Sequence, residues 1–363
     1  MSRESARQPI RLNMRIENPP RFFLIMAMLV LGSILVRNLW ISDDSFITMR
    51  VVDNFLHGYG LVWNVGERVQ VFTHPLWLFL LVPLARFIHD PYYVLYIPSF
   101  LISLGAIYLF LQRFAVGPRA IVLTTIALGG SMAFIDYSSS GLENPLTHLL
   151  LVLYLIILFR EDERPFRKLL HLSLLTALGG LTRLDAMLLL LPGLARQFWL
   201  CRDEWRKALG VILAGLLPLI LWELFALFYY GFPFPNTYYV KARTGLDTYY
   251  LLKQGAAYFA NSIHWDPFTL GSVLLGLITV GFQGNAKRLS VAVGIALYAL
   301  YILWIGGDFM SSRFFSVIFL MGLTLLLTFD LVRTVGLIPP KMCYLVLILL
   351  LFLGLTAELP PVL

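Results

Sequence analysis

Long apolar runs separated by short polar connections fill almost the whole chain. An α-helix needs about 20 apolar residues to cross a bilayer. Runs of about this kind occupy 22–41, 75–88, 92–111, 119–135, 144–159, 168–181, 185–200, 208–230, 267–283, 289–306, 314–332 and 341–357. The runs 75–88 and 168–181 fall several residues short of a full crossing. The pattern predicts an all-α integral membrane protein, a polytopic helical bundle of about 11 transmembrane helices, within a range of roughly 10 to 13.

Basic residues orient this bundle, because cytoplasmic loops of membrane proteins are enriched in Lys and Arg. Five arginines precede the first run and predict a cytoplasmic tail at 1–21, followed by a transmembrane domain at 22–360. Further basic connections lie at 160–168, 196–207, 283–288 and 333–341. The segments 42–74 and 231–266 then face outward. The basic loop 112–119 fits the cytoplasmic side only if 75–88 is re-entrant or interfacial.

Composition narrows the class of protein further. The chain has 363 residues, of which 59% are hydrophobic and 13% charged, whereas soluble domains average roughly 45–50% apolar and about 25% charged residues. A water-soluble enzyme is therefore excluded. The net charge of +7 comes mainly from the expected cytoplasmic segments, so it does not indicate a nucleic-acid partner. The two cysteines, Cys201 and Cys343, form neither a disulfide framework nor a metal site.

The acidic residues gather at the opposite set of helix ends. Under the predicted topology the outward acids are Asp43, Asp44, Asp136, Glu143, Asp185 and Asp308. Acids from several separate connections on one side predict a cavity at the outer membrane face, although single acids are ordinary in polar loops. The segment 42–76 is the most informative, because it is too aromatic for a simple loop and too polar for a span. We expect interfacial helices there, packed over the cavity mouth.

The adjacent carboxylates Asp43 and Asp44 open this segment. Neighbouring like charges repel, so one carboxylate can gain affinity for protons and act as a general base. The pair could instead bind a divalent cation through its oxygens, or Asp43 could simply cap the following helix. We predict no other metal site, because the histidines lack zinc-binding spacing, and no cofactor, because nucleotide-binding and hydrolase motifs are missing from the sequence.

Four further polar stretches supply candidate substrate-binding residues. In the stretch 306–314, Asp308 offers a carboxylate and Arg313 a guanidinium fork suited to phosphate. Arg183 and Asp185 are close enough to neutralise each other at a helix end. The remaining candidates in these stretches and in 42–76 are Arg50, His74, Glu143, Asn144, Asn236, Lys241 and Arg243.

Five motifs occur in a characteristic order: DDSFITMRVVDNFLHGYGLVWNVGERVQVFTHPLW, SSGLENPL, LTRLDA, PNTYYVKA and GGDFMSSRF. Together they resemble polytopic bacterial glycosyltransferases of the GT-C fold, in the branch that includes the mycobacterial terminal β-arabinofuranosyltransferase. The resemblance covers about 22–332. Many such proteins continue into a soluble periplasmic domain, whereas we expect no large soluble C-terminal domain after the last apolar run of this chain.

The resemblance implies an enzyme of the bacterial cytoplasmic (inner) membrane with a periplasmic active site. It implies an inverting transfer of a sugar from a polyprenyl-phosphate donor to a hydroxyl of a cell-envelope glycan, lipid or protein. An aspartate of the pair would be the base. We assign this role to Asp44, with Asp43 positioning it or the acceptor. Phosphate would then meet Arg313, Lys241 and Arg243, and sugar hydroxyls would meet Glu143, Asn144 and Asp308.

Two other classes of function fit the same chain. A transporter or flippase for a lipid-linked or anionic substrate predicts ionisable residues along the span interiors and matching halves. The charges of this chain gather at helix ends instead, and no halves match. A non-catalytic membrane protein that only binds a lipid-linked sugar is also compatible with the sequence.

Overall fold

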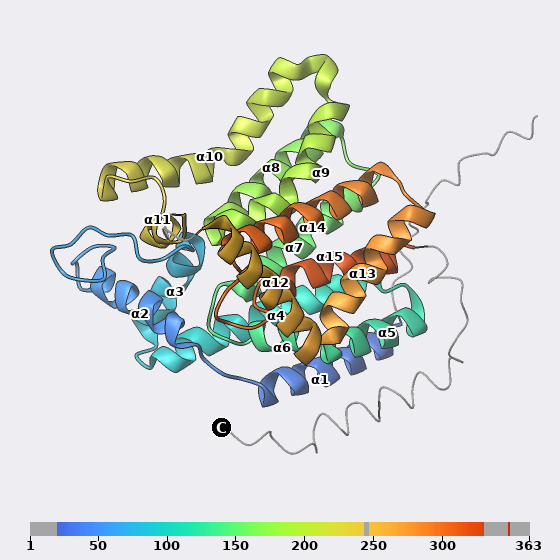
Figure 1. Cartoon of the computed structure of the whole chain (residues 1–363), viewed down its shortest axis with the longest axis horizontal. Coiled ribbons are helices and arrows are strands. Elements are labelled where there is room, and N and C mark those ends of the chain that lie inside the picture. Colours follow the sequence, from blue (N-terminus) through green and yellow to red (C-terminus); the bar gives the residue numbers. More distant parts are fainter. Residues whose placement is uncertain (1–19, 243–246, 330–347, 349–363) are drawn as a thin grey trace, which may run out of the picture.

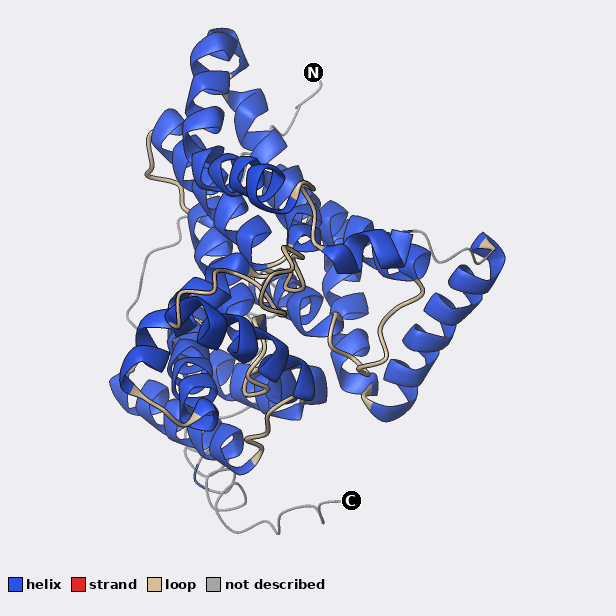
Figure 2. Ribbon diagram, turned by 90° about the vertical axis from the view of Figure 1, so that its left-hand side faces the viewer, coloured by secondary structure: helices blue, strands red, loops and turns tan. Residues whose placement is uncertain are grey.

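The computed structural model describes residues 20–242, 247–329 and 348. These residues form α-helices, short 3₁₀ turns and loops, with no strand among them, as Figure 2 shows. The all-α prediction is confirmed. The tail before residue 20, most of the last apolar run 341–357, Cys343 and Arg243 lie outside the described residues.

The helices follow the apolar runs closely. In chain order they are α1 Arg21–Arg37, α2 Asp43–Leu56, α3 Pro75–Phe87, α4 Pro91–Phe114, α5 Gly117–Gly130, α6 Met132–Tyr137, α7 Asn144–Phe159, α8 Pro165–Thr182, η1 Leu184–Ala186, α9 Met187–Leu200, η2 Arg202–Glu204, α10 Trp205–Tyr230, α11 Asn236–Ala242, α12 Thr248–Trp265, α13 Pro267–Phe282, α14 Ala286–Ile305 and α15 Phe315–Leu327.

Among the described residues, fewer helices are long and apolar enough to cross a membrane than the apolar runs of the sequence predict. Three helices are long and apolar enough to span a membrane: α4, η2 with α10, and α14. A fourth span is possible if α12 and α13, which bend by 106° between them, are counted as one broken span. Helices α3, α7 and α15 are apolar but shorter. The protein is therefore a membrane protein with three to four candidate spans among its described residues, and the prediction of about 11 spans is not confirmed.

The structure corrects two details of the predicted helices. The run 119–135 is not one helix, because the chain breaks at Ser131 between α5 and α6. The Ser131 hydroxyl accepts a hydrogen bond from the Phe134 amide and so caps α6. The segment 42–74, which we predict to face outward, holds a single helix, α2, followed by a glycine-rich turn, rather than several interfacial helices.

Helix α15 forms the centre of the bundle (Figure 1), and almost every one of its residues is buried. A helix that is apolar on all sides is stable only inside a large core or a membrane. Close packing depends on small residues: α13 crosses α15 where Gly276 meets Gly322, and a Cβ at either position would overlap the neighbouring helix. Small residues allow such close backbone approach between membrane helices.

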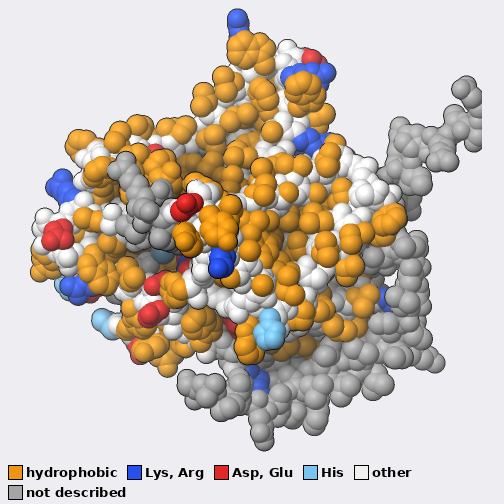
Figure 3. Space-filling model, viewed as in Figure 1, with side chains coloured by type: hydrophobic (Ala, Val, Ile, Leu, Met, Phe, Trp, Pro, Cys, Tyr) orange, Lys and Arg blue, Asp and Glu red, His pale blue; other side chains and the backbone are white. Residues whose placement is uncertain are grey.

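The outer helices leave apolar side chains exposed. Helix α10 extends from the bundle along α8 (Figure 1) and exposes a row of leucines and phenylalanines along its 26 residues. Apolar side chains also cover most of the face shown in Figure 3, and charged groups are few there. Such a surface suits hydrocarbon rather than water.

One buried turn ties the first outward segment to the bundle. In the turn 138–143, Ser138, Ser139 and Ser140 are fully buried. The Ser140 carbonyl accepts hydrogen bonds from the Ser42 amide and the Ser45 hydroxyl, and the Trp77 indole donates to the Gly141 carbonyl at 3.2 Å. The beginnings of α2 and α3 are therefore both fixed to the residues that precede α7.

Candidate active site

A cavity of about 720 Å³ lies beside this turn. Its walls come from α2, from the segment 71–74, from the residues after α8, from α11 and α12, and from the end of α14 with the loop 306–314. Charged or ionisable side chains far apart in sequence meet there: Asp44, His74, Arg183, Asp185, Asp308 and Arg313. The lining also includes the aromatic side chains Tyr238, Tyr301, Trp304 and Phe309.

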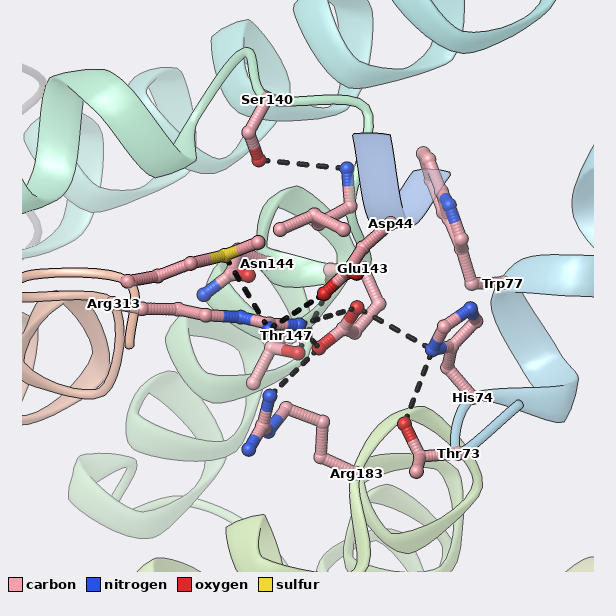
Figure 4. A network of polar contacts seen from close by, with 12 residues as sticks. Asp44, Thr73, His74, Trp77, Ser140, Glu143, Asn144, Thr147, Arg183 and Arg313 are labelled. Carbon is pink, nitrogen blue, oxygen red and sulfur yellow. Dashed lines mark hydrogen bonds and ion pairs between the residues drawn. The ribbon is translucent and has the colours of Figure 1, made fainter. Parts of the chain in front are cut away.

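Glu143 lies at the centre of the polar contacts (Figure 4), and its side chain is 0% exposed. Its Oε1 atom accepts hydrogen bonds from Arg183 Nη1 at 2.9 Å and from Arg313 Nη2 at 3.0 Å, and His74 Nδ1 lies 3.4 Å from its Oε2 atom. Burial alone would raise the pKa of Glu143, but the positive charges of Arg313 and Arg183 hold it well below its usual range. The carboxylate is therefore ionised and shared between two arginines.

Each of the three guanidinium nitrogens of Arg183 donates to a carboxylate oxygen. Its Nε and Nη2 atoms donate to the two oxygens of Asp185 at 3.0 and 2.7 Å, while Nη1 donates to Glu143. This bidentate geometry is the strong form of an arginine–carboxylate pair. Asp185 also lies near the Tyr298 hydroxyl, at 3.4 Å. The expected neutralisation of Arg183 by Asp185 is thus present in the structure, with Glu143 as a further partner.

The Arg313 guanidinium has hydrogen-bond donors that the described residues do not satisfy. Its Nη2 atom is bound to Glu143, and its Nη1 atom donates a weak hydrogen bond to the Met310 sulfur at 3.6 Å. Asp308 and Asp44 lie 3.6 and 3.9 Å from Nη1, beyond hydrogen-bond distance for an oxygen acceptor. Its Nε atom is buried without a hydrogen-bond partner among the described residues. Buried donors are rarely left unpaired in proteins, because each costs about 1–3 kcal/mol. The arrangement suits an anionic ligand that brings additional acceptor oxygens into the cavity.

The two aspartates at the start of α2 have different surroundings. Asp43 is exposed, and its Oδ1 atom accepts a hydrogen bond from the Asp44 amide at 2.9 Å. The Asp44 side chain is 35% exposed and lines the cavity. Burial raises the pKa of Asp44, Arg313 lowers it, and the carboxylates of Asp43, Asp308 and Glu143 raise it again, for a net upward shift. The proton affinity of Asp44 is therefore above that of an ordinary aspartate, which suits a general base.

His74 is held by a residue that sequence reasoning missed. Its Nε2 atom lies 2.7 Å from the Thr48 hydroxyl, and both side chains are buried. Burial lowers the pKa of His74, and the opposing effect of Glu143 is weakened by Arg313 and Arg183, so the imidazole is neutral. Thr48 follows Asp44 by four residues on α2, and this spacing, which places both on one helix face, was the available signal.

The loop 306–314 is clamped in place by two tyrosines. The Tyr258 hydroxyl donates to the Met310 carbonyl at 3.1 Å, and the Tyr137 hydroxyl donates to the Ser311 carbonyl at 2.9 Å. Gly307 has a φ of 77°, and a Cβ there would meet the Tyr258 ring. The loop that carries Asp308 and Arg313 is therefore shaped by side chains from α6 and α12.

Arg50, Asn144 and Asn236 do not line the cavity. Arg50 is exposed and donates to the Trp63 carbonyl at 3.3 Å. Asn144 is buried, and its amide nitrogen lies 3.4 Å from the Ser316 hydroxyl. Asn236 begins α11 with its amide bound to the Gln70 carbonyl. Lys241 belongs to α11, but its side chain is outside the described residues. Glu143 is bound to the two arginines and is likewise not among the lining residues of the cavity.

The acids do not form a multidentate metal site. Within 20–242 and 247–329, no group of three or more His, Cys, Asp or Glu side chains could hold a metal ion. Asp136 lies outside the cavity wall, and burial together with the nearby Asp266 raises the pKa of Asp136 to about 6. The outward acids thus separate into a group at the cavity and a second pair beside α13.

Fold and site together define a class: an all-helical membrane protein whose cavity combines a half-buried carboxylate, an arginine with an unpaired Nε donor among the described residues, and apolar lining residues. In sequence the chain is similar to the terminal beta-(1->2)-arabinofuranosyltransferase of Mycobacterium tuberculosis, with 29% identity over 322 residues, or 76% of this chain and 50% of the relative. It is similar to the Corynebacterium glutamicum protein of the same name, with 27% identity over 321 residues, or 76% of this chain and 46% of the relative. The resemblance to this branch of glycosyltransferases is confirmed. The chain spans about half the length of these curated relatives. No family model and no solved structure matches it.

Proposed function

We propose that the protein is an inverting membrane glycosyltransferase of GT-C type. It transfers a sugar from a polyprenyl-phosphate donor to an acceptor hydroxyl of a cell-envelope glycan, lipid or protein, at the periplasmic face of the bacterial inner membrane. Asp44 is the general base. The observation that carries the proposal is the position of Arg313, with donors unsatisfied by the described residues, beside the half-buried Asp44 in one cavity.

The two walls of the cavity match the two parts of such a donor. A polyprenyl-phosphate sugar combines an apolar chain with an anionic phosphate and a polar sugar. The aromatic and apolar wall formed by Tyr238, Trp304 and Phe309 suits the chain. The Arg313 guanidinium suits the phosphate, since an arginine fork matches phosphate oxygens in geometry and charge. Asp308 is within reach of a sugar hydroxyl at the same wall.

The chemistry needs no nucleotide and no bound cofactor. The acceptor oxygen forms a bond to the anomeric carbon while the bond from that carbon to the phosphate oxygen breaks, so the configuration inverts. The acceptor proton passes to Asp44, and the electron pair of the broken bond leaves with polyprenyl phosphate. Stabilising this developing charge is the task of preorganised cations. The relatives' name makes an arabinofuranosyl donor the first candidate, although the chain spans only half of those proteins. An inverting transfer that forms a β-(1->2) linkage needs the α anomer of that donor.

The test is a transfer assay on purified protein in detergent or nanodiscs. Polyprenyl-phosphate sugars, with the arabinofuranosyl donor first, are offered to glycan and lipid acceptors with metal and with chelator. We expect transfer by the wild type and a loss of at least 10³-fold in Asp44→Asn, because a neutral amide accepts no proton. Asp53→Asn is the matched control on the same helix, since Asp53 is exposed and pairs with His57.

Three outcomes would contradict the proposal. Full activity of Asp44→Asn would remove Asp44 as the base. Net movement of donor across the bilayer without transfer would favour a flippase. Donor binding with neither transfer nor movement would favour a non-catalytic lipid-sugar-binding protein.

A further inference from the structure

The two arginines bound to Glu143 are not equivalent. Arg183 donates from Nε, Nη1 and Nη2 to carboxylate oxygens at 3.0 Å or less, and its guanidinium also lies 4.8 Å from the centre of the Phe314 ring. Arg313 has one short carboxylate contact, to Glu143. Arg183 therefore supports the site, whereas Arg313 retains donors for a partner that changes during the reaction.

Arg313 lies close to two further carboxylates, those of Asp44 and Asp308. Its Nη1 atom is 3.9 Å from Asp44 Oδ2 and 3.6 Å from Asp308 Oδ2. The charged groups that act on Asp44 are Asp43 on its own helix, Glu143 in the 138–143 turn, and Asp308 and Arg313 in the loop 306–314. Arg313 is the cation among them, so the ionisation of Asp44 depends on where the charge of Arg313 is directed.

We propose that Arg313 couples the base to the leaving group, with its guanidinium held on Glu143 while its Nη1 group, which makes only a weak bond to the Met310 sulfur, is shared between the Asp44 carboxylate and the phosphate. The inference rests on the function proposed above. During transfer, Asp44 gains the acceptor proton and loses its negative charge, while the phosphate changes from a diester with one charge to a monoester with an additional charge. Negative charge leaves one side of Arg313 as it appears on the other.

Proton and product binding are therefore linked. A phosphate monoester that occupies Arg313 withdraws it from Asp44 and adds a negative charge nearby, and both effects favour protonation of Asp44. Binding of the product should draw a proton from solution onto this carboxylate. A role of Arg313 that is only structural, or confined to binding the phosphate, produces no such proton uptake by Asp44.

The experiment measures proton uptake when farnesyl monophosphate binds to the full chain in detergent. Calorimetric titrations in two buffers of different ionisation enthalpy, repeated between pH 5 and 8, give the number of protons taken up. We expect the wild type to take up as much as one more proton per bound molecule than Asp44→Asn does. Protonation of the ligand's own phosphate contributes equally in the two proteins and cancels in this comparison. Arg183→Lys is the matched control, because Arg183 shares Glu143 but does not act on Asp44, and it should retain the uptake.

Arg313 variants give a second readout. Arg313→Gln should weaken farnesyl phosphate binding at least 10-fold and move the acid limb of the transfer profile to higher pH, since Arg313 lowers the pKa of Asp44. Glu143→Gln should move that limb to lower pH, since Glu143 raises the same pKa. Equal proton uptake by the wild type and Asp44→Asn at every pH would overturn the coupling but would not contradict the proposed glycosyltransferase function. No binding to the wild type would overturn the donor class, and the coupling with it.

Discussion

Replacing Glu143 by Gln removes the carboxylate that holds Arg183 and Arg313 together. At an effective dielectric constant near 20, unit charges at 2.9 and 3.0 Å attract by about 5–6 kcal/mol each. The cost of burying three charged groups offsets most of this sum, and breaking buried ion pairs by removing one partner costs about 3–5 kcal/mol. The variant also leaves two guanidinium groups facing each other. We expect a loss of about 3–5 kcal/mol of stability and a fall of about 5–10 °C in the unfolding temperature.

The assay is thermal unfolding of the purified protein in one detergent, followed by intrinsic fluorescence at a fixed scan rate. Glu204→Gln is the matched control, because Glu204 makes a 3.0 Å pair with Lys207 and both side chains are more than half exposed. Such exposed pairs contribute about 0–1 kcal/mol, so its unfolding temperature should stay within about 2 °C of the wild type. An equal and small effect of both substitutions would refute the central role of Glu143.

The pH dependence follows from the direction of the shift. Because the pKa of Glu143 is lowered on folding, its contribution is fully present above the unfolded-state value of about 4.3. It is lost only as the pH falls further, toward the lower folded-state value. The difference between wild type and Glu143→Gln should therefore be constant from pH 5 to 8 and shrink in stronger acid. A difference that grows on acidification would contradict this account.

Two further predictions concern the surroundings of the site. Burial and the nearby Asp266 raise the pKa of Asp136 to about 6. Ionising Asp136 therefore opposes folding, and stability falls by about 3 kcal/mol as the pH rises from about 4 to 6. Asp136→Asn should raise the unfolding temperature at pH 7.5 but not at pH 4, and an equal effect at both pH values would contradict this direction of the pH dependence. Gly307→Ala places a Cβ against the Tyr258 ring, whereas Gly58 has a similar positive φ and open space around it. We expect at least a 10-fold loss of transfer activity for Gly307→Ala, and for Gly58→Ala only a loss of stability from backbone strain, about 1–2 kcal/mol. Equal activity of the two variants would argue against the clamped loop.

Some of the residues that line the cavity could be predicted from their positions at the ends of the apolar runs. Asp44, Arg183, Asp308 and Arg313 follow or precede apolar runs that the predicted topology brings to one face, and the structure places all four at one cavity. The same reasoning assigned sugar contacts to Glu143, which is buried behind the arginines. The neighbouring sequence does not distinguish a buried carboxylate at the start of a helix from an exposed one, because the partners of the buried carboxylate come from other segments of the chain.

The two adjacent aspartates illustrate the limit of local reasoning. Neighbouring residues on a helix point about 100° apart, so only one of Asp43 and Asp44 can face the cavity. Which one does so depends on how α2 is rotated about its axis. That rotation is set by contacts of Ser42 and Ser45 with the Ser140 carbonyl, about 95 residues away in the chain, and no periodicity in α2 reveals it.

By itself, the sequence determined that this protein belongs in a membrane, that it is helical, and that its carboxylates and arginines stand at helix ends. Those properties depend on composition and on periodicity over about 20 residues, which act locally. Tertiary structure decided that Glu143 binds Arg183 and Arg313, that Arg313 keeps free donors, and that Asp44 rather than Asp43 meets them in the cavity. Arg313 and Glu143 are 170 residues apart, and electrostatic energy depends on distance in space, which only the packing of the helices sets.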